Sequence, residues 1–247
     1  RITSSIFQFN WLVLPQILLF LFLSLYLVVG IYVFQYLDEE LSAKSFNEML
    51  LFEVSTLATI GYGDVHPKTM AARAFCMAFS ILGIPLFLLM VANIGKHLTK
   101  AFWHIYSRFV GKTQLGALRG DMKMPLVVSV SLFSIIIAIG TETMAHNGDG
   151  SFIDDLYFSF ISFATVGYGD KVPIVNTMTR LIFGLIYIIA GVVAISAIFT
   201  TFNDYLRKLH YIGRRFRGSR DVQVWMGGRS MTVSKLLSIV GEEFDVS

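Results

Sequence analysis

Two six-residue segments carry the residues of this chain that are best suited to chemistry. The sequence contains Thr59-Ile60-Gly61-Tyr62-Gly63-Asp64 and, 106 residues later, Thr165-Val166-Gly167-Tyr168-Gly169-Asp170. Backbone carbonyls that line a narrow path can replace the water shell of a potassium ion. A chain that points successive carbonyls to one side must enter the left-handed region, which glycine tolerates. The glycine spacing therefore predicts two stretches of main-chain oxygens that bind K⁺ ions.

Each residue of these segments has an expected role. The predicted selectivity filter consists of Thr59, Ile60, Gly61, Tyr62, Gly63, Thr165, Val166, Gly167, Tyr168 and Gly169. The threonines add hydroxyl oxygens at the inner end, and the tyrosines pack behind the filter as struts. Asp64 and Asp170 follow at the outer mouth. The motif is that of known potassium filters, and the expected selectivity for K⁺ rests on this likeness.

A single Gly-Tyr-Gly is more often an ordinary turn, but here it belongs to a larger internal repeat. At the same offset of 106, Ser45 matches Ser151, Phe46 matches Phe152, Glu48 matches Asp154, Leu50 matches Leu156, Phe52 matches Phe158 and Pro67 matches Pro173. The duplication of a whole structural unit makes a chance turn a poor explanation.

The segments need elements that hold them in place, and each is preceded by a predicted short helix. Ser45 with Glu48, and Ser151 with Asp154, fit the Ser-x-x-acid pattern of a helix start. We expect helices over 46–57 and 152–163. About 12 residues at 1.5 Å each cannot cross a bilayer, so these are predicted re-entrant pore helices whose negative C-terminal ends face the cation path.

The composition indicates a membrane protein: 55% of the 247 residues are hydrophobic and 15% are charged. Four apolar segments have lengths close to that of a membrane span: Trp11 to Leu37, Ala71 to Ile94, Met124 to Gly140 and Leu181 to Phe202. The predicted fold is an all-α integral membrane protein with four transmembrane helices, two re-entrant pore helices and two filter loops. We expect a first span-pore-span repeat over 1–94, a cytoplasmic linker over 95–123, a second repeat over 124–206 and a cytoplasmic C-terminal segment over 207–247.

Charge predicts the orientation. Residues 95–123 hold six basic residues against Asp121, and residues 203–220 hold six against Asp204. The positive-inside rule places both segments, and both termini, in the cytoplasm, with the acidic loops before the pore helices outside, most simply at the plasma membrane. Arg214, Arg215 and Arg217 also suggest a site for anionic lipid, although topology alone explains them. A net charge of +3 and the juxtamembrane position argue against nucleic acid as a partner.

The order of span, pore loop, span, linker, span, pore loop and span resembles the two-pore-domain potassium channels over about residues 11–206. Gly83-Ile84-Pro85 in the second span is shared with that family. The resemblance implies a homodimer, or a heterodimer with a family member, because four filter segments must close a pseudo-fourfold pore. It also implies a background or leak conductance gated mainly at the filter, with K⁺ in the pore and no enzymatic cofactor.

One feature departs from the animal members of that family, which usually carry a long extracellular cap, often with a cysteine. Only about eight residues, Asp38 to Ser45, are available here, so the cap is either naturally absent or trimmed. Cys76, in the second span, is expected to be a buried small hydrophobe. Two alternatives stay open: a potassium transporter built from span-pore-span repeats, and a non-conducting accessory subunit.

Gating residues and other functions can also be weighed. Gly83, Pro85 and Gly191 are possible hinges, or plain packing residues, and His66 is a pH sensor or an ordinary loop histidine.

The spans lack the regularly spaced arginines of a voltage sensor, so we expect no voltage sensing. The sequence has no nucleophile elbow, phosphate loop or metal-ligand spacing, so we expect no enzyme. In the tail, 222–226 alternates like a strand, Gly227-Gly228 suggests a tight turn, and a helix is expected from Thr232.

Overall fold

The computed structural model describes residues 2–110, 124–143, 151–211, 223–226, 229–232 and 235. The chain divides into two compact units, Arg1–Phe202 and Asn203–Ser247. The boundary lies inside the last long helix. Each unit is described by itself below, and the first one holds both glycine-rich segments.

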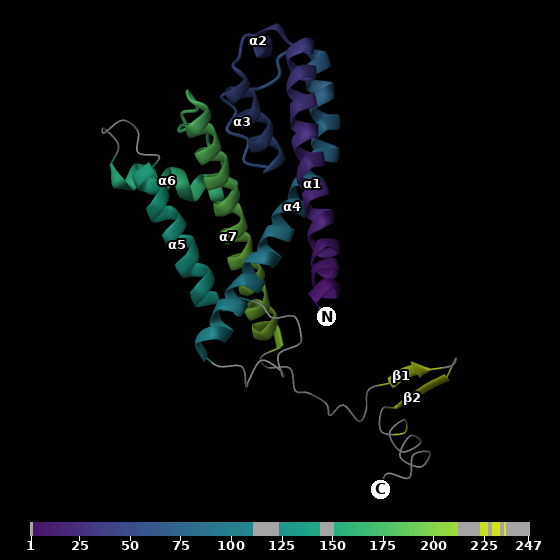
Figure 1. Ribbon diagram of the computed structural model, residues 1–247. Coiled ribbons are helices and arrows are strands. Elements are labelled where there is room, and N and C mark those ends of the chain that lie inside the picture. The colour runs from purple at the N-terminus through teal and green to yellow at the C-terminus, as the bar shows by residue number, and fades with distance from the viewer. Residues whose placement is uncertain are drawn as a thin grey trace. The chain divides into compact units, whose positions relative to one another are not determined.

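The first half of the first unit is helical throughout. It consists of α1 (Ile2–Leu37), the short α2 (Glu39–Ser42), α3 (Phe46–Leu57) and α4 (Met70–Val110). Helix α3 lies against α1 and the first part of α4 (Figure 1). The fully buried ring of Phe34 on α1 meets Phe52 of α3 and Phe75 and Phe79 of α4 edge-on, at centroid distances of 5.3, 4.8 and 5.4 Å. These aromatic contacts fix the short helix between the two long ones.

The second half repeats this plan with α5 (Leu126–Thr143), α6 (Phe152–Phe163) and α7 (Met178–Tyr211). Phe163, at the end of α6, is fully buried. Its ring lies edge-on to Phe133 of α5 at 5.9 Å and to Tyr187 of α7 at 4.8 Å. A second aromatic anchor therefore holds the second short helix between its neighbours.

The two short helices begin and end where the sequence predicted. At Ser45 the reciprocal capping box is complete, because Ser45 Oγ accepts from the N–H of Glu48 and the Glu48 carboxylate accepts from the N–H of Ser45 at 2.9 Å. The second start differs: Ser151 Oγ accepts from the N–H of Ile153 at 3.3 Å. The shorter Asp154 side chain pairs with Lys171 at 3.1 Å, so the predicted pattern forms a full box in the first half alone.

Three helices of the described residues are long and apolar enough to cross a membrane. Their candidate spans are Leu14–Leu37, Met70–Arg108 and Met178–Arg207. The apolar part of α5, Leu126–Gly140, is shorter. The whole of α5 has 18 residues, or about 27 Å of helix, which is close to a hydrocarbon core of about 30 Å. The third predicted span is therefore helical and remains the shortest of the four.

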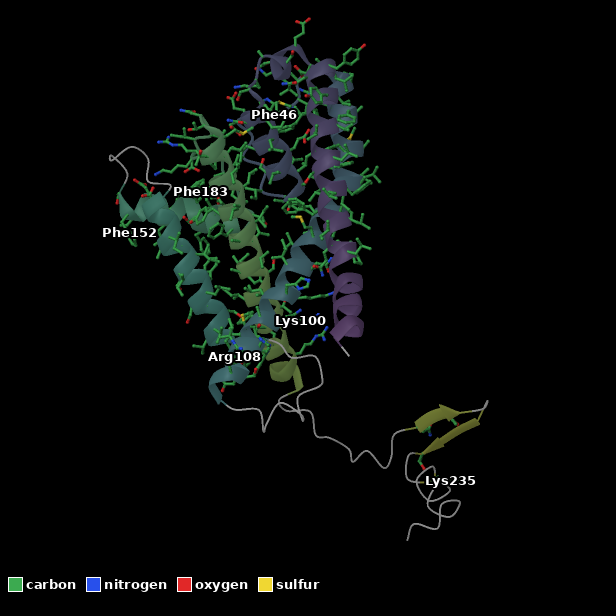
Figure 2. All side chains as sticks on the ribbon, viewed as in Figure 1. Phe46, Lys100, Arg108, Phe152, Phe183 and Lys235 are labelled. Carbon is green, nitrogen blue, oxygen red and sulfur yellow. The ribbon has the colours of Figure 1, made fainter. Side chains whose placement is uncertain are left out.

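Helix α4 extends well past the predicted end of its span at residue 94. Its first part packs on α1, where Tyr26 and Phe79 stack at 4.7 Å, and its later part slants away from α1 (Figure 1). Phe87, Met90 and Val91 share a buried cluster with Ile188 and Val192 of α7, so α4 also joins the two halves. Beyond the span α4 carries Lys96, Lys100 and Arg108; Figure 2 labels the last two.

The described residues of the second unit include a small hairpin. Strands β1 (Gln223–Met226) and β2 (Arg229–Thr232) pair antiparallel, with Met226 opposite Arg229. This register fits the tight turn predicted at Gly227-Gly228, whose residues lie outside the described part of the chain. The helix expected from Thr232 does not begin there, because Thr232 is the last residue of β2 and pairs with Gln223.

Candidate cation site

The backbone of both glycine-rich segments alternates in a way that few sequences allow. In the first segment φ is +57° at Thr59, +62° at Gly61 and +81° at Gly63. In the second it is +54° at Thr165, +51° at Gly167 and +78° at Gly169. When residues alternate between left-handed and ordinary conformations, N–H groups gather on one side of the chain and carbonyls on the other. Both segments therefore have the backbone of a carbonyl-lined path.

The left-handed threonines were not foreseen in the sequence analysis, which assigned the strained positions to the glycines. For a residue with a Cβ atom, the left-handed conformation is about 1 kcal/mol or more less favourable than the ordinary one. Thr59 and Thr165 are the only non-glycine residues with positive φ in the described part of the chain. Their identical placement at the same step of each segment shows that the strain belongs to the conformation of the segment.

The N–H side of each segment is tied to the helix before it. The N–H groups of Ile60 and Gly61 both donate to the carbonyl of Ser55, at 2.9 and 3.1 Å. In the second half the N–H groups of Val166 and Gly167 both donate to the carbonyl of Ile161, at 2.9 and 3.3 Å. Ser55 and Ile161 are equivalent in the repeat. The short helices thus turn the N–H groups toward themselves and leave the carbonyls of the segments for the other side.

The two segments lie against each other, although 106 residues separate them. A Cβ atom built on Gly167 would collide with the carbonyl oxygen of Ile60, and one on Gly169 with that of Tyr62. Glycine is therefore required there by space as well as by conformation. A Cβ atom on Gly61 would meet nothing, so that side of the first segment is open.

The two tyrosines have opposite surroundings. Tyr62 is 4% exposed, its hydroxyl donates to Ser162 Oγ on α6 at 2.9 Å, and its ring stacks on Phe158 at 6.4 Å. It packs behind the segment as the predicted strut. Tyr168, its counterpart, is 71% exposed. The repeat places Thr56 and Phe52 of α3 where Ser162 and Phe158 stand on α6, yet Tyr168 does not pack against them within this chain.

The outer ends of the segments also differ. Asp64 and Asp170 are both exposed, and Tyr157 of α6 is a neighbour of Asp170. The equivalent of Tyr157 in the first half is Leu51, which has no hydroxyl to offer Asp64. After the first segment, Nδ1 of His66 lies 3.0 Å from the carbonyl oxygen of Gly63.

Asp38 holds the loop after the first segment, a role that the sequence analysis missed. Its carboxylate is 3% exposed and accepts from the N–H groups of Lys68 and Thr69 at 2.8 and 3.0 Å, and from that of Glu40 at 3.1 Å. These hydrogen bonds hold the pKa of Asp38 below its ordinary value, and the bond from Thr69 has the largest effect. The Asp38 side chain thereby joins the end of α1 to the start of α4.

Asn47, on α3, holds the loop after the second segment. Its side-chain amide donates to the carbonyl of Val175 at 2.9 Å. Both outer loops are therefore anchored to residues of the first half. The repeat offers no hint of this, because Asn47 corresponds to Ile153 in the second half.

The possible hinge residues sit in tight packing. A Cβ atom on Gly83 would press on Leu57 of α3 and Tyr26 of α1, and one on Gly191 would press on the ring of Phe163. Helix α4 is continuous through Pro85. These contacts give both glycines a packing role, and a hinge role stays a prediction. The suggested lipid contacts Arg214, Arg215 and Arg217 lie outside the described residues.

Comparison with known proteins adds independent findings. A protein-family model described as "Ion channel" matches residues 19–100 and 126–208, so it matches once in each half of the chain. The chain is similar to TWiK family of potassium channels protein 7 of Caenorhabditis elegans, at 29% identity over 217 residues, 78% of this chain and 39% of the relative. It is also similar to protein 9 of the same family and organism, at 23% identity over 285 residues, 85% of this chain and 50% of the relative.

A human relative is similar over a shorter stretch. Potassium channel subfamily K member 17 of Homo sapiens is 36% identical over 139 residues, 52% of this chain and 39% of the relative. The chain spans between 39% and 50% of the length of these relatives. Together the matches confirm the resemblance to two-pore-domain potassium channels, and with the apolar helices they identify an integral membrane protein.

Proposed function

Because the chain belongs to the ion-channel family, whose model covers both of its halves, we propose that it is a potassium-selective channel. It conducts K⁺ passively across a membrane, as a background channel gated mainly at the filter. The observation that carries this proposal is the pair of adjoining segments whose residues alternate in and out of the left-handed region. Main-chain oxygens presented in this way can replace the hydration shell of K⁺.

A complete path needs four such segments, and the open sides of this chain support a dimer. In one chain the glycines of the second segment face the carbonyls of the first. Gly61 faces open space, while Val166 and Tyr168 are 45% and 71% exposed. The first segment of a partner chain can therefore cover the exposed second segment, and its second segment can cover the open side of the first. Two copies close a ring in which first and second segments alternate.

The same symmetry proposes one specific contact. Tyr168 would hydrogen bond to Thr56 of the partner subunit, as Tyr62 does to Ser162 within the chain. Thr56 is the repeat equivalent of Ser162 and lies on α3.

The proposed membrane orientation rests on the basic residues Lys96, Lys100 and Arg108 of α4. They favour a cytoplasmic position for this end of α4, with both termini also in the cytoplasm and the protein in the plasma membrane.

The test is the reversal potential of purified protein in lipid bilayers with mixed potassium and sodium solutions. We expect a potential close to that of K⁺ and a flux that barium blocks. Gly167→Ala should abolish selective flux, because φ and space both forbid a Cβ atom. Gly95→Ala is the matched control, since its Cβ atom would lie at an ordinary 4.0 Å from Val193.

Other outcomes would point elsewhere. Equal permeability to sodium would contradict the proposal. Saturating uptake without single-channel events would favour the transporter alternative, and a complete lack of flux from a correctly folded dimer would favour the accessory subunit.

A further inference from the structure

An acidic side chain lies buried behind the first glycine-rich segment, and none of the described residues binds it. Glu53 stands on α3 and is 0% exposed. Both of its carboxylate oxygens lack a hydrogen-bond partner among the described residues. Glu48, on the same helix, is by contrast bonded to Ser45 and Lys44. Burying an unpartnered carboxylate is far more costly than burying its neutral form, so Glu53 calls for a ligand.

The surroundings of Glu53 are apolar and are shaped to admit its side chain. Gly30 of α1 leaves the room, because a Cβ atom there would lie 2.5 Å from Glu53 Oε1 and 2.6 Å from the ring of Phe79. Tyr26 and Phe79 stack at 4.7 Å close by, and the hydroxyl of Tyr26 already donates to the carbonyl of Phe79 at 2.7 Å. The walls around the carboxyl group are therefore rings and a glycine.

The second half shows what a satisfied version of this position is like. Ser159 is the repeat equivalent of Glu53 and is 1% exposed. It receives a 2.6 Å hydrogen bond from the hydroxyl of Tyr187 and donates to the carbonyl of Asp155 at 2.7 Å. Phe79 stands at the position equivalent to Tyr187, because α4 begins at Met70 and α7 at Met178, so the first half has no such hydroxyl to offer Glu53.

The size and chemistry of the site select its ligand. A metal cation needs several oxygen ligands, which rings and a glycine do not supply. A proton needs only the carboxyl group itself. Tyr26 of α1 is a titratable neighbour of Glu53, and its hydroxyl is already engaged. From α4 the half-buried thiol of Cys76 packs against the hydrophobic core cluster that includes Phe52 and Val54 of α3. From α7 the buried side chains of that cluster are the apolar Leu181, Ile188, Val192 and Val193.

We propose that Glu53 is a proton-binding site behind the first filter, and that its carboxyl group is protonated when the channel conducts K⁺. The protonation of Glu53 can affect the filter because Glu53 lies close to it on α3. The carbonyl of Ser55, two residues further along this helix, accepts hydrogen bonds from the N–H groups of Ile60 and Gly61. An ionised Glu53 draws in water or displaces α3, and the carbonyl path moves with it. The effect on conduction rests on the proposed potassium channel, whereas the presence of the proton does not.

The proton is detected directly by infrared difference spectroscopy of the intact protein in lipid. We expect the parent at neutral pH to show the carbonyl stretch of a buried, protonated carboxylic acid, and Glu53→Gln to lack it. Glu48→Gln is the matched control on the same helix and should keep the band. Glu53→Asp, which should shift the band, provides the assignment if the glutamine variant does not fold. A parent spectrum without this band overturns the proposal.

Potassium flux then tests the coupling. In the parent we expect reversible loss of flux in alkali, by about tenfold per pH unit once the site begins to empty. Glu53→Gln, which resembles the protonated acid, should conduct at neutral pH and keep its flux in alkali. An identical alkaline loss in both proteins overturns the coupling. A parent that shows the band but never conducts K⁺ would contradict the proposed function and leave the proton site supported.

Discussion

The hydroxyl of Tyr62 donates a 2.9 Å hydrogen bond to Ser162 Oγ, and this bond ties the first glycine-rich segment to α6, the short helix of the other half. The two residues are 100 positions apart in the chain. The halves are therefore joined at the glycine-rich segments as well as through α4 and α7. The stability of these segments should depend on contacts between repeats.

Tyr62→Phe tests this contact. The substitution removes the donor and leaves Ser162 Oγ buried without it, so we expect a loss of about 1–2 kcal/mol in the free energy of unfolding. Thermal unfolding of the purified protein measures it. Tyr168→Phe is the matched variant: if Tyr168 binds Thr56 of the partner subunit, it should cost a similar amount. A Tyr168→Phe protein as stable as the parent would contradict that contact.

Gly191→Ala should destabilise the protein by about 1–3 kcal/mol, as overpacking does in a well-filled core. The new methyl group would press on the ring of Phe163, which is fully buried. Thermal unfolding again gives the measurement, and the double variant Gly191→Ala/Phe163→Leu should recover part of the loss. If Gly191→Ala is as stable as the parent but has an altered open probability, the hinge role is favoured over packing.

The short helices could be predicted to the residue, and the reason is physical. Ser45 and Ser151 are strong N-caps, and a glycine-rich segment ends each apolar run. Both ends of each short helix are therefore determined by residues close by in the sequence. The ends of α4 and α7 could not be placed in this way. An apolar run ends where the membrane ends, while a helix continues as long as its backbone bonds do, which in α4 is to Val110.

The contacts that hold the candidate site were much harder to foresee. Asp38 and Asn47 act through backbone groups of loops that are distant in sequence, and no local pattern marks such partners. Glu53 did leave a signal, because an acid in the middle of a short apolar helix is unusual. The repeat alone predicts equivalent positions, yet Tyr62 and Tyr168 show that equivalent residues have different surroundings in one chain.

Asp38→Asn should loosen the loop after the first glycine-rich segment. The pKa of Asp38 is lowered by its backbone hydrogen bonds, so its folded pKa lies below the ordinary value of 3.8. Its contribution to stability is therefore complete above that value and is lost as the pH falls through the folded pKa. We expect the variant to be less stable than the parent at pH 7 and the difference to shrink in acid below about pH 4.

Thermal unfolding at neutral and acidic pH measures this difference for Asp38→Asn. Glu39→Gln, which removes the exposed carboxylate next in sequence, is the control and should unfold like the parent. A gap between parent and Asp38→Asn that stays constant down to the lowest pH would show that the carboxylate charge is not what holds the loop.

His66→Gln tests whether the histidine after the first filter senses outer pH. Its Nδ1 lies 3.0 Å from the carbonyl oxygen of Gly63, at the outer end of the proposed ion path. A charged imidazole there repels incoming K⁺. We expect outer acidification to reduce inward current in the parent and to have little effect on His66→Gln. His104→Gln, on α4, should respond like the parent. Should His66→Gln also respond like the parent, His66 is an ordinary loop histidine, and the Gly63 contact has no part in pH sensing.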